Sequence, residues 1–517
     1  MPMSDLLFRP LTQQIDALVR RSVSAVELMR ETLARIDATR DTLNSFSAVA
    51  ERDALLAEAR AADQRIASGD ARPLEGIPLG VKDLFDARGL VTSMGSIPFQ
   101  ENLASEDSVQ VARLRAAGAI VVGKTNVPEF GHTAITKNLL HGVSRNPWDL
   151  ERTPGGSSGG SAAAIAGGVV SLVTASDGGG SIRLPASFTG CFGLKPSWGR
   201  IPNERDHWVM DDTAVQGPLT RTVEDAALFL DLTAGVHPSD PNSLPDPGIS
   251  YRAVLGELSR GLRVGYSPDL GYAVVQSDVA EVAYDAARFF AQDHRFEEIE
   301  GGPPQLGRKW GMLGAFEGLG EIERLLPEHE KEFGRGFLEG MLAGRRMTPA
   351  FWAEIRRERE KLNRWCAEMF ARYDLLLTPT VPFDPPPARG PLPAETEGRK
   401  QPAVGVASFT IPWNLAWHPA ATVRAGFSQA RLPVGLQIAA PRHRDELVLQ
   451  AAHAFERARP WADDWPRPQE GRRKSAPQVS RSEPKASEDH RTAQRGEAER
   501  RPEPERERSA SAKARQG

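Results

Sequence analysis

The sequence predicts an α/β fold in which short buried strands alternate with helices. Apolar runs at 77–81, 119–122, 169–175 and 262–266 have the length and composition typical of buried strands. Apolar residues recur at helical spacing through 11–65, which predicts two amphipathic helices there, and 278–372 is expected to be mostly helical. The chain has 517 residues, more than a single core usually holds, so length alone favours two domains.

Other elements follow in chain order. A small apolar helix is predicted at 160–167, directly before the strand at 169–175. Thr222 is expected to cap a buried helix at 226–233, with Asp225 at the third helical position. The proline-rich run at 382–401 indicates a surface loop, and a last helix is predicted at 445–457.

The segment 153–197 holds two glycine-serine turns about twenty residues apart, GGSSGG at 155–160 and DGGGS at 177–181. Glycine clusters permit backbone conformations that side chains forbid and leave N–H groups open to a ligand. We expect Ser157 or Ser158 to cap the helix at 160–167, and the following strand to return both turns to one edge of a sheet. Asp177 is expected to fix its turn through bonds to backbone N–H groups.

The N–H groups of Gly178, Gly179, Gly180 and Ser181 can form a concave nest suited to an oxyanion. A serine at the end of such a nest is a candidate nucleophile.

Eight motifs together resemble the amidase signature family of Ser-cisSer-Lys amide hydrolases, over about residues 10–460. They are GIPLGVKD at 76–83, GKTNVPEF at 123–130, RNPW at 145–148, GGSSGG at 155–160, DGGGSIR at 177–183, GLKP at 193–196, LLTPT at 376–380 and LPVGLQ at 432–437. The resemblance implies one large α/β domain with a mixed, many-stranded sheet flanked by helices on both faces. It also implies an amidase that hydrolyses the C–N bond of a carboxylic-acid amide.

The resemblance implies a mechanism in which Ser181 attacks the carbonyl, Ser157 relays the proton and Lys82 is the base. It places a cis peptide bond between Gly156 and Ser157, and no metal or organic cofactor is required. Lysine has an ordinary pKa of about 10.4, so a basic Lys82 must be buried.

Four residues are expected to support the site: Gly156, Ser158, Asp177 and Arg183. Arg183 is expected to pair with a carboxylate and so to fix the turn. The acyl pocket is expected to come from the helical region 300–370 and the irregular segment 383–427. Trp417 and His418 depart from the family pattern after Asn414 and are expected to narrow or reshape that pocket.

Two other motifs match patterns from different enzyme classes. GAIVVGKT at 118–125 has the letters of a phosphate-binding loop, but 119–122 is itself a predicted strand and Pro128 interrupts any following helix. Residues 155–159 match the G-x-S-x-G elbow of α/β-hydrolases, which needs a strand directly before it, and 146–154 is predicted to be loop. Neither motif is expected to carry its usual function.

Composition and charge limit the kinds of partner and the compartment that we expect for this protein. The formal net charge is −4, and 471–517 holds 13 Lys and Arg against 8 Asp and Glu, so the rest of the chain carries −9 and gives no support to nucleic-acid binding. Two cysteines, no export signal and no apolar run of membrane-spanning length favour a cytoplasmic protein without membrane contact. The expected partners are a small amide and water, with a homodimer as an open option.

The predicted organisation has N-terminal helices at 1–70, a catalytic domain at 71–468 and a disordered charged tail at 469–517. From 471 onward the tail has no aromatic residue and only Val479 as an aliphatic residue larger than alanine. Two alternative functions stay open. One is the amidase subunit of an amidotransferase, in which the family turn would carry threonine at the position of Gly178. The other is a binding protein on a decayed amidase fold, which the presence of Lys82, Ser157 and Ser181 disfavours.

Overall fold

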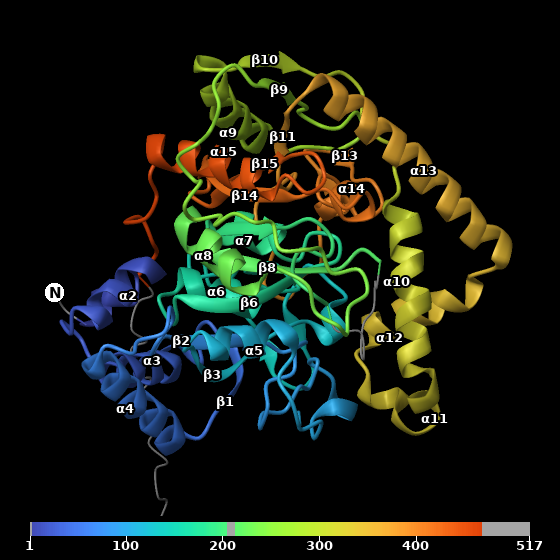
Figure 1. The fold of residues 1–517 in the computed structure, drawn as a ribbon. Coiled ribbons are helices and arrows are strands. Elements are labelled where there is room, and N and C mark those ends of the chain that lie inside the picture. Colours follow the sequence, from blue (N-terminus) through green and yellow to red (C-terminus); the bar gives the residue numbers. More distant parts are fainter. Residues whose placement is uncertain (1–2, 204–211, 468–517) are drawn as a thin grey trace, which may run out of the picture. The chain divides into compact units, whose positions relative to one another are not determined.

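The structure is a computed structural model that describes residues 3–203 and 212–467 (Figure 1). The described residues belong to one compact unit. The tail predicted at 469–517 lies outside the described residues, and the boundary predicted at residue 70 remains a prediction.

The centre of the fold is a mixed sheet of eleven strands with helices on both faces, as the family resemblance implies. Strands β2 and β3 and strands β9 and β11 pair in parallel, whereas β6–β8 and β14–β15 are antiparallel. The order across the sheet is β1 (Phe46–Val49), β3 (Ile120–Thr125), β2 (Pro78–Lys82), β6 (Leu172–Asp177), β8 (Val215–Thr220), β7 (Phe192–Lys195), β14 (Ala420–Phe427), β15 (Pro433–Ala439), β11 (Leu375–Pro379), β9 (Arg263–Tyr266) and β10 (Arg295–Glu298). Two hairpins lie outside it, formed by β4 (Lys137–Asn138) with β5 (Gly142–Val143) and by β12 (Glu395–Thr396) with β13 (Arg399–Lys400).

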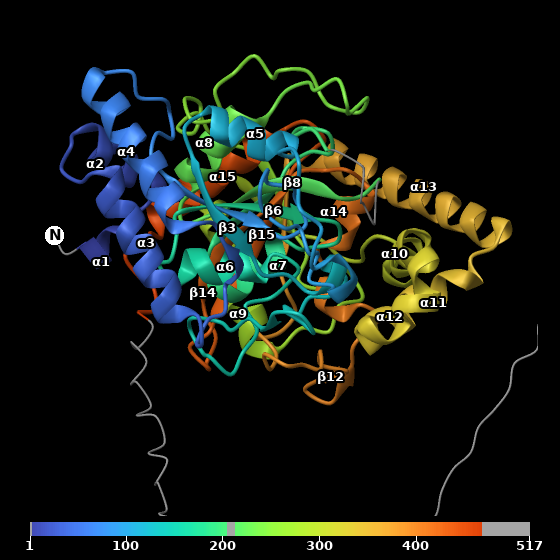
Figure 2. The same cartoon turned by 90° about the horizontal axis from the view of Figure 1, so that it is seen from below.

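The helices divide into an N-terminal group, a group on the sheet and a group beside it. The first contains α1 (Met3–Leu6), α2 (Leu11–Val19), α3 (Ala25–Thr39) and α4 (Arg52–Ser68). The second contains α5 (Val109–Ala116), α6 (Gly159–Ala166), α7 (Arg183–Thr189), α8 (Val223–Thr233), α9 (Ser277–Ala287), α14 (Ile411–Leu415) and α15 (Asp445–Ala458). Of these, α6, α7, α8, α9 and α15 contact strands of the sheet directly. The third contains α10 (Gly307–Ile322), α11 (Leu326–His329), α12 (Arg335–Leu342) and α13 (Pro349–Arg372). Figures 1 and 2 show that α2–α4 and α10–α13 lie on opposite sides of the sheet.

The N-terminal region differs from the prediction of two helices in 11–65. It contains three helices and the edge strand β1, which pairs antiparallel with β3. Helix α3 starts with a capping box, in which the Ser24 hydroxyl accepts from Glu27 N and the Glu27 carboxylate accepts from Ser24 N. Strand β1 has only four half-buried residues, so it lacks the fully apolar run by which the other strands were found.

Three further boundaries differ from the sequence predictions. The strand predicted at 169–175 begins three residues later, because Gly168 has a positive φ of 63° and the chain is still turning at Val169. The predicted helical region 278–372 also holds strand β10, and the predicted loop at 382–401 holds the hairpin β12–β13.

Two other predictions are confirmed. The Thr222 hydroxyl caps α8 by accepting from Asp225 N. Residues 123–125 of the phosphate-loop pattern continue strand β3, so the pattern forms no loop.

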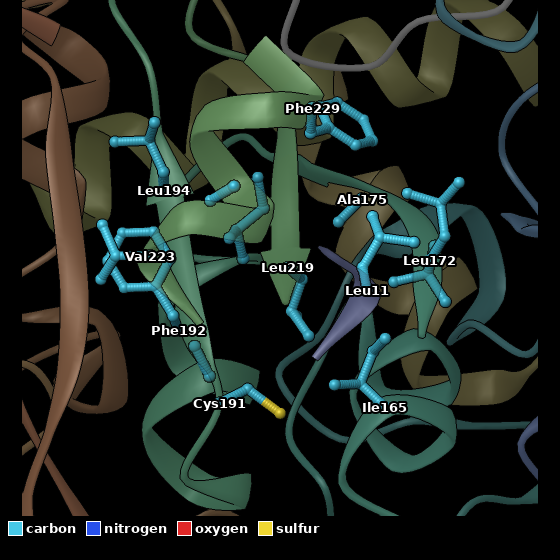
Figure 3. Close-up of a cluster of buried hydrophobic side chains, with 14 of the residues drawn as sticks. Leu11, Ile165, Leu172, Ala175, Cys191, Phe192, Leu194, Leu219, Val223 and Phe229 are labelled. Carbon is cyan, nitrogen blue, oxygen red and sulfur yellow. The ribbon is translucent and has the colours of Figure 1, made fainter. Parts of the chain in front are cut away.

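The main hydrophobic core surrounds strands β6, β7 and β8 (Figure 3). Its side chains come from both the strands and the helices on them, and those labelled in the figure are Leu11, Ile165, Leu172, Ala175, Cys191, Phe192, Leu194, Leu219, Val223 and Phe229. Helix α2 joins this core through Leu11, which is far from the other members in the sequence. The N-terminal helices are therefore part of the packing that supports β6.

No helix among residues 3–203 and 212–467 is long and apolar enough to cross a membrane.

Replacement of Asp225 tests how α2 is held. The buried Asp225 carboxylate of α8 accepts from the backbone N–H groups of Leu11 and Thr12, at 3.0 and 3.1 Å, and the preceding Pro10 supplies no side-chain cap. Asp225→Ala leaves both donors unsatisfied, so we expect the free energy of unfolding to fall by about 1–3 kcal/mol. Urea denaturation would measure the change. The matched change Asp16→Ala, in the exposed pair with Arg20, should cost less than about 0.5 kcal/mol, and equal effects would contradict this account.

Candidate active site

The two glycine-serine turns meet at a cavity of about 180 Å³. The first turn leads into α6 and the second follows β6, and the Ser158 N–H donates to the Ser181 carbonyl at 3.2 Å. The cavity is lined at this end by Ser157, Ser176 and Ser181. The structure therefore brings together the two serines that the sequence analysis singled out.

Lys82 lies at the end of β2, and its side chain is fully buried. Its Nζ contacts three hydroxyl oxygens, those of Ser157 at 2.9 Å and of Ser158 and Ser176 at 2.8 Å. Removal from water lowers the pKa of Lys82 to about 7, although the Asp177 carboxylate acts in the opposite direction. A substantial fraction of this lysine is therefore neutral near pH 7.

The Ser158 hydroxyl does not cap the helix, contrary to the prediction that Ser157 or Ser158 would. Ser158 occupies the residue before α6, but its side chain accepts no bond from the helix N–H groups. Its Oγ instead accepts from Lys82 and donates to the Ser176 carbonyl at 3.3 Å. The Ser158 hydroxyl therefore bonds to the buried Lys82 and not to the N-terminus of α6.

The Gly156–Ser157 peptide bond is cis, as the family resemblance implies. A Cβ atom at Gly156 would lie 2.6 Å from the Thr133 carbonyl oxygen, so no larger residue fits there. Glycine at this position is therefore required by contact with the segment that precedes β4.

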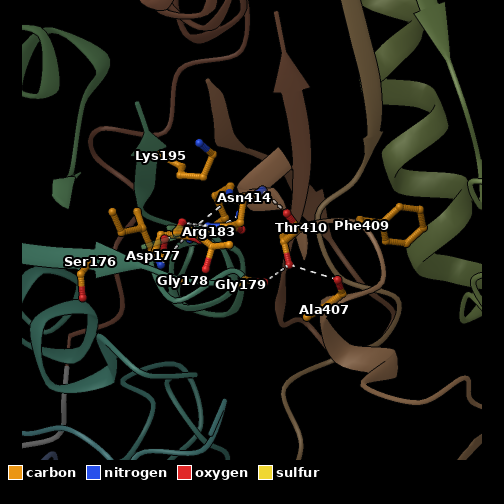
Figure 4. A network of polar contacts seen from close by, with 12 residues as sticks. Ser176, Asp177, Gly178, Gly179, Arg183, Lys195, Ala407, Phe409, Thr410 and Asn414 are labelled. Carbon is orange, nitrogen blue, oxygen red and sulfur yellow. Dashed lines mark hydrogen bonds and ion pairs between the residues drawn. The ribbon is translucent and has the colours of Figure 1, made fainter. Parts of the chain in front are cut away.

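An ion pair between Asp177 and Arg183 fixes the second turn (Figure 4). Both side chains are fully buried, and Arg183 Nη2 lies 2.8 Å from Asp177 Oδ1. Asp177 Oδ2 also accepts from the backbone N–H groups of Ile182 and Arg183. Burial by itself raises the pKa of the Asp177 carboxyl, but the Arg183 guanidinium and its hydrogen bonds bring that pKa down to about 2. The predicted carboxylate partner of Arg183 is thus Asp177.

Several polar residues of the site were given no role by sequence reasoning. Arg183 also donates to the side chains of Asn414, at 2.6 Å, and Gln437, at 2.8 Å. Thr174 Oγ1 accepts from the Lys82 backbone N–H. Gln437 stands in a motif that carries the family resemblance, and Asn414 lies just before the point where the chain departs from the family pattern, so these two offered a signal. Thr174 and Ser176 stand in a strand whose sequence resembles ordinary core.

The walls of the cavity come mainly from three segments. Those at 300–370 and 383–427 were expected, and they contribute Trp310, Phe337, Met341, Leu392, Val404, Val406 and Ala407. The third, at 84–134, was missed and contributes Leu84, Met94, Phe130, Gly131, His132, Thr133 and Ala134. The aromatic side chains of Phe316 and Trp352 are exposed instead.

Trp417 and His418 do not line the cavity, so the prediction that they reshape it is wrong. The Trp417 ring stacks on Trp198 with centroids 4.4 Å apart. The His418 ring packs against Phe370 and Trp413, and burial lowers its pKa to about 3. Both side chains are held by neighbours within the fold.

The elbow pattern at 155–159 does not have the structure of an α/β-hydrolase elbow. No strand directly precedes it, and the hydrogen-bond partner of Ser157 is a lysine. In the part of the chain that the structure describes, no group of three or more His, Cys, Asp or Glu could hold a metal ion.

Comparison with known proteins agrees with this geometry. A sequence profile described as Amidase matches residues 27–449. The chain belongs to the amidase signature family. An acylamidase from Rhodococcus erythropolis is 35% identical over 473 residues, covering 88% of this chain and 96% of that protein. A glutamyl-tRNA(Gln) amidotransferase subunit from Geobacter sp. (strain M21) is 33% identical over 507 residues, covering 89% of this chain and 99% of that protein.

Among solved structures, a bacterial aryl acylamidase of the amidase signature family superposes with a TM-score of 0.83 at 28% identity. The match covers 89% of this chain and 98% of that one. This amidase is accordingly a hydrolase that acts on amide bonds.

Removing the guanidinium of Arg183 tests the ion pair in this amidase. Arg183→Met leaves the Asp177 carboxylate buried without its main partner, so we expect the free energy of unfolding to fall by about 3–5 kcal/mol. The control is Arg263→Met, which breaks a partly exposed pair with Asp374 and should cost about 1 kcal/mol or less. Chemical denaturation would compare the two variants. Similar losses in the free energy of unfolding would show that the buried pair of Arg183 contributes no more to stability than the partly exposed pair of Arg263.

Proposed function

We propose that this amidase hydrolyses uncharged, apolar carboxylic-acid amides through an acyl-enzyme on Ser181, with Ser157 as proton relay and Lys82 as base. The observation that carries the proposal is the contact of the buried Lys82 Nζ with Ser157 Oγ, together with a lysine pKa of about 7. Ser157 and Ser181 line the same cavity.

The proposed reaction has two halves. Neutral Lys82 takes the Ser157 proton, Ser157 takes the Ser181 proton, and Ser181 Oγ bonds to the amide carbonyl carbon. The resulting oxyanion is held by N–H groups of residues 178–181. When the C–N bond breaks, Ser157 gives its proton to the leaving amine and takes the proton of the Lys82 ammonium, so that Lys82 is neutral again. Water then adds to the acyl-enzyme with the same groups acting as base and acid, which releases the carboxylic acid and restores Ser181.

The hydroxyls around Lys82 favour this direction of proton flow. Because the Ser158 hydroxyl donates to the Ser176 carbonyl, it accepts from an N–H of Lys82. A neutral amine has two N–H donors and one lone pair. If Ser176 Oγ accepts the second N–H, the lone pair is left for the Ser157 hydroxyl. Ser158 and Ser176 would thus orient the base.

The lining of the cavity supports an uncharged substrate. Among the described residues, no Asp, Glu, Lys or Arg side chain lines it, and His132 is the one lining residue with an ionisable side chain. His132 is an exposed residue at the cavity, and the protein around its imidazole removes enough water to lower the pKa of that ring. A charged group on the substrate would lose hydration without gaining an ionic partner. The name of one relative of solved structure, an aryl acylamidase, agrees with an apolar substrate.

A second candidate is the glutaminase subunit of an amidotransferase, favoured by the similarity to the Geobacter protein. Glutamine carries an ammonium and a carboxylate, and the cavity offers no counter-charge to either from the described residues. Gly178, where the family turn of such subunits is expected to carry threonine, also favours a free-standing hydrolase. Glutamine hydrolysis that depends on an added partner protein would reverse this order of preference.

Covalent labelling tests the nucleophile. A small alkyl fluorophosphonate should add to the protein once, on the peptide that contains Ser181, as measured by intact mass and peptide mapping. Ser181→Ala should abolish both labelling and amide hydrolysis, since it removes the acyl-forming oxygen. The control is Ser187→Ala, which changes a buried serine that does not line the cavity. Label on Ser157 would contradict the assignment, and no label would favour the binding-protein alternative.

The pH dependence of kcat/KM tests the base. Lys82 accepts a proton only when neutral, so activity should rise about tenfold per pH unit up to about pH 7 and then level off. The measurement uses a neutral amide between about pH 5 and 9, so that only the enzyme titrates. Lys82→Met should lower kcat/KM strongly and remove this acid limb, whereas Lys137→Met, at an exposed lysine, should keep it. An acid limb that survives in Lys82→Met would mean that another group is the base.

A further inference from the structure

Every carbonyl of the segment 177–181 accepts a hydrogen bond. The donors and distances are Asn414 Nδ2 to Asp177 O at 2.7 Å, Trp310 Nε1 to Gly178 O at 2.9 Å, Thr410 Oγ1 to Gly179 O at 2.6 Å, Leu184 N to Gly180 O at 2.7 Å, and Ser158 N to Ser181 O at 3.2 Å. The contacts of Gly179 with Thr410 and of Asp177 with Asn414 are visible in Figure 4. The acceptor side of this loop is therefore fully engaged.

The N–H groups of this loop differ from its carbonyls in their hydrogen bonding. Within 3–203 and 212–467, none of the N–H groups of Gly178, Gly179, Gly180 and Ser181 donates a hydrogen bond. Gly178, Gly179 and Ser181 line the cavity. A segment with all its carbonyls held and its N–H groups unused is arranged to receive an anion.

Holding a carbonyl also fixes the next N–H. The C=O of one residue and the N–H of the following residue share a rigid plane and point in opposite directions across a trans peptide bond. The bond from Trp310 therefore sets the direction of the Gly179 N–H, and the bond from Thr410 sets that of the Gly180 N–H. Neither peptide can rotate without breaking its bond.

Short distances show that the side chains of Trp310 and Thr410 lie directly against the loop. A Cβ atom at Gly179 would lie 2.3 Å from Cζ2 of the Trp310 indole, and one at Gly180 would lie 2.5 Å from Thr410 Oγ1. Gly180 also has a φ of 141°, which side chains rarely adopt. The glycines are thus matched to these two side chains.

We propose that Trp310 and Thr410 are positioning residues for the oxyanion site, and act by holding the carbonyls of Gly178 and Gly179. This inference rests on the proposed function of Ser181. The other three donors cannot be tested separately in the same way. Leu184 and Ser158 donate from the backbone, and Asn414 also bonds the buried Asp177 carboxylate.

The first experiment compares kcat and KM for a neutral amide. Trp310→Phe keeps an aromatic ring but removes the N–H, and Thr410→Val removes the hydroxyl at nearly constant volume. Loss of a direct oxyanion donor lowers kcat by about 100- to 1,000-fold, so loss of its support should lower kcat by about 10- to 100-fold. KM should stay within about threefold, because the bonds matter most when charge develops. Thr410→Ser should restore kcat to within about threefold of the wild type.

Matched controls keep the loop contacts intact. Trp365→Phe removes an indole that packs against the same hydrophobic cluster as Trp310, and Ser408→Ala removes a hydroxyl that donates to the Gly405 carbonyl. Both should leave kcat unchanged within about twofold.

A tetrahedral inhibitor supplies a second readout. An arylboronic acid forms a tetrahedral adduct with a serine nucleophile and places an oxygen where the oxyanion would be. Its inhibition constant should rise in Trp310→Phe and Thr410→Val in parallel with the loss of kcat/KM. The thermal midpoints of both variants should remain close to that of the wild type.

The outcomes separate this inference from the proposed function. If the fluorophosphonate fails to label Ser181 in the wild type, the proposed function itself is wrong. If Ser181 is labelled but both variants keep wild-type kcat, the positioning role is overturned. The role is also overturned if kcat, KM and thermal midpoint change together, or if Thr410→Ser fails to rescue.

Discussion

The whole site depends on the burial of one ammonium group. Lys82 ends a central strand and is surrounded by protein, and among the described residues only serine oxygens contact its Nζ within hydrogen-bond distance. Burial of this kind costs free energy for the charged form, which is why the pKa falls to about 7. The surrounding core must therefore be stable enough to tolerate it.

The second constraint is the balance of charge around the turn at 177–183. Asp177 could have paired with Lys82, but Arg183 engages its carboxylate instead, with Asn414 and the N–H groups of the turn. This arrangement keeps the aspartate ionised, as its pKa of about 2 indicates, while the lysine stays largely without a counter-ion. One buried ion pair thus shapes the turn and leaves the neighbouring amine of Lys82 without a direct ionic partner.

Much of the fold and the centre of the site could be predicted from sequence, for identifiable reasons. The strands β2, β3 and β6 are short apolar runs. The two serines could be found because each lies in a glycine-rich turn. Strands β1 and β10 were missed because they are half-buried or exposed edge strands without an apolar run. The prediction that Ser158 caps α6 was wrong because its hydroxyl accepts a hydrogen bond from Lys82, which is distant in the sequence, and not from the N–H groups of the helix. The cavity walls at 84–134 come from irregular segments, whose positions depend on packing that no periodicity encodes.

Trp310 both lines the cavity and donates a hydrogen bond to the loop at 177–181. Helix α10, which carries it in its first turn, lies in the group of helices beside the sheet, outside the segments that define the family resemblance. On the positioning role proposed above, substitutions that adapt the pocket to a new amide at this position would also alter the rate of bond cleavage. Evolution or engineering of specificity in this enzyme therefore has more freedom at Phe337 or Met341, which line the cavity on α12 without touching the loop carbonyls, than at Trp310.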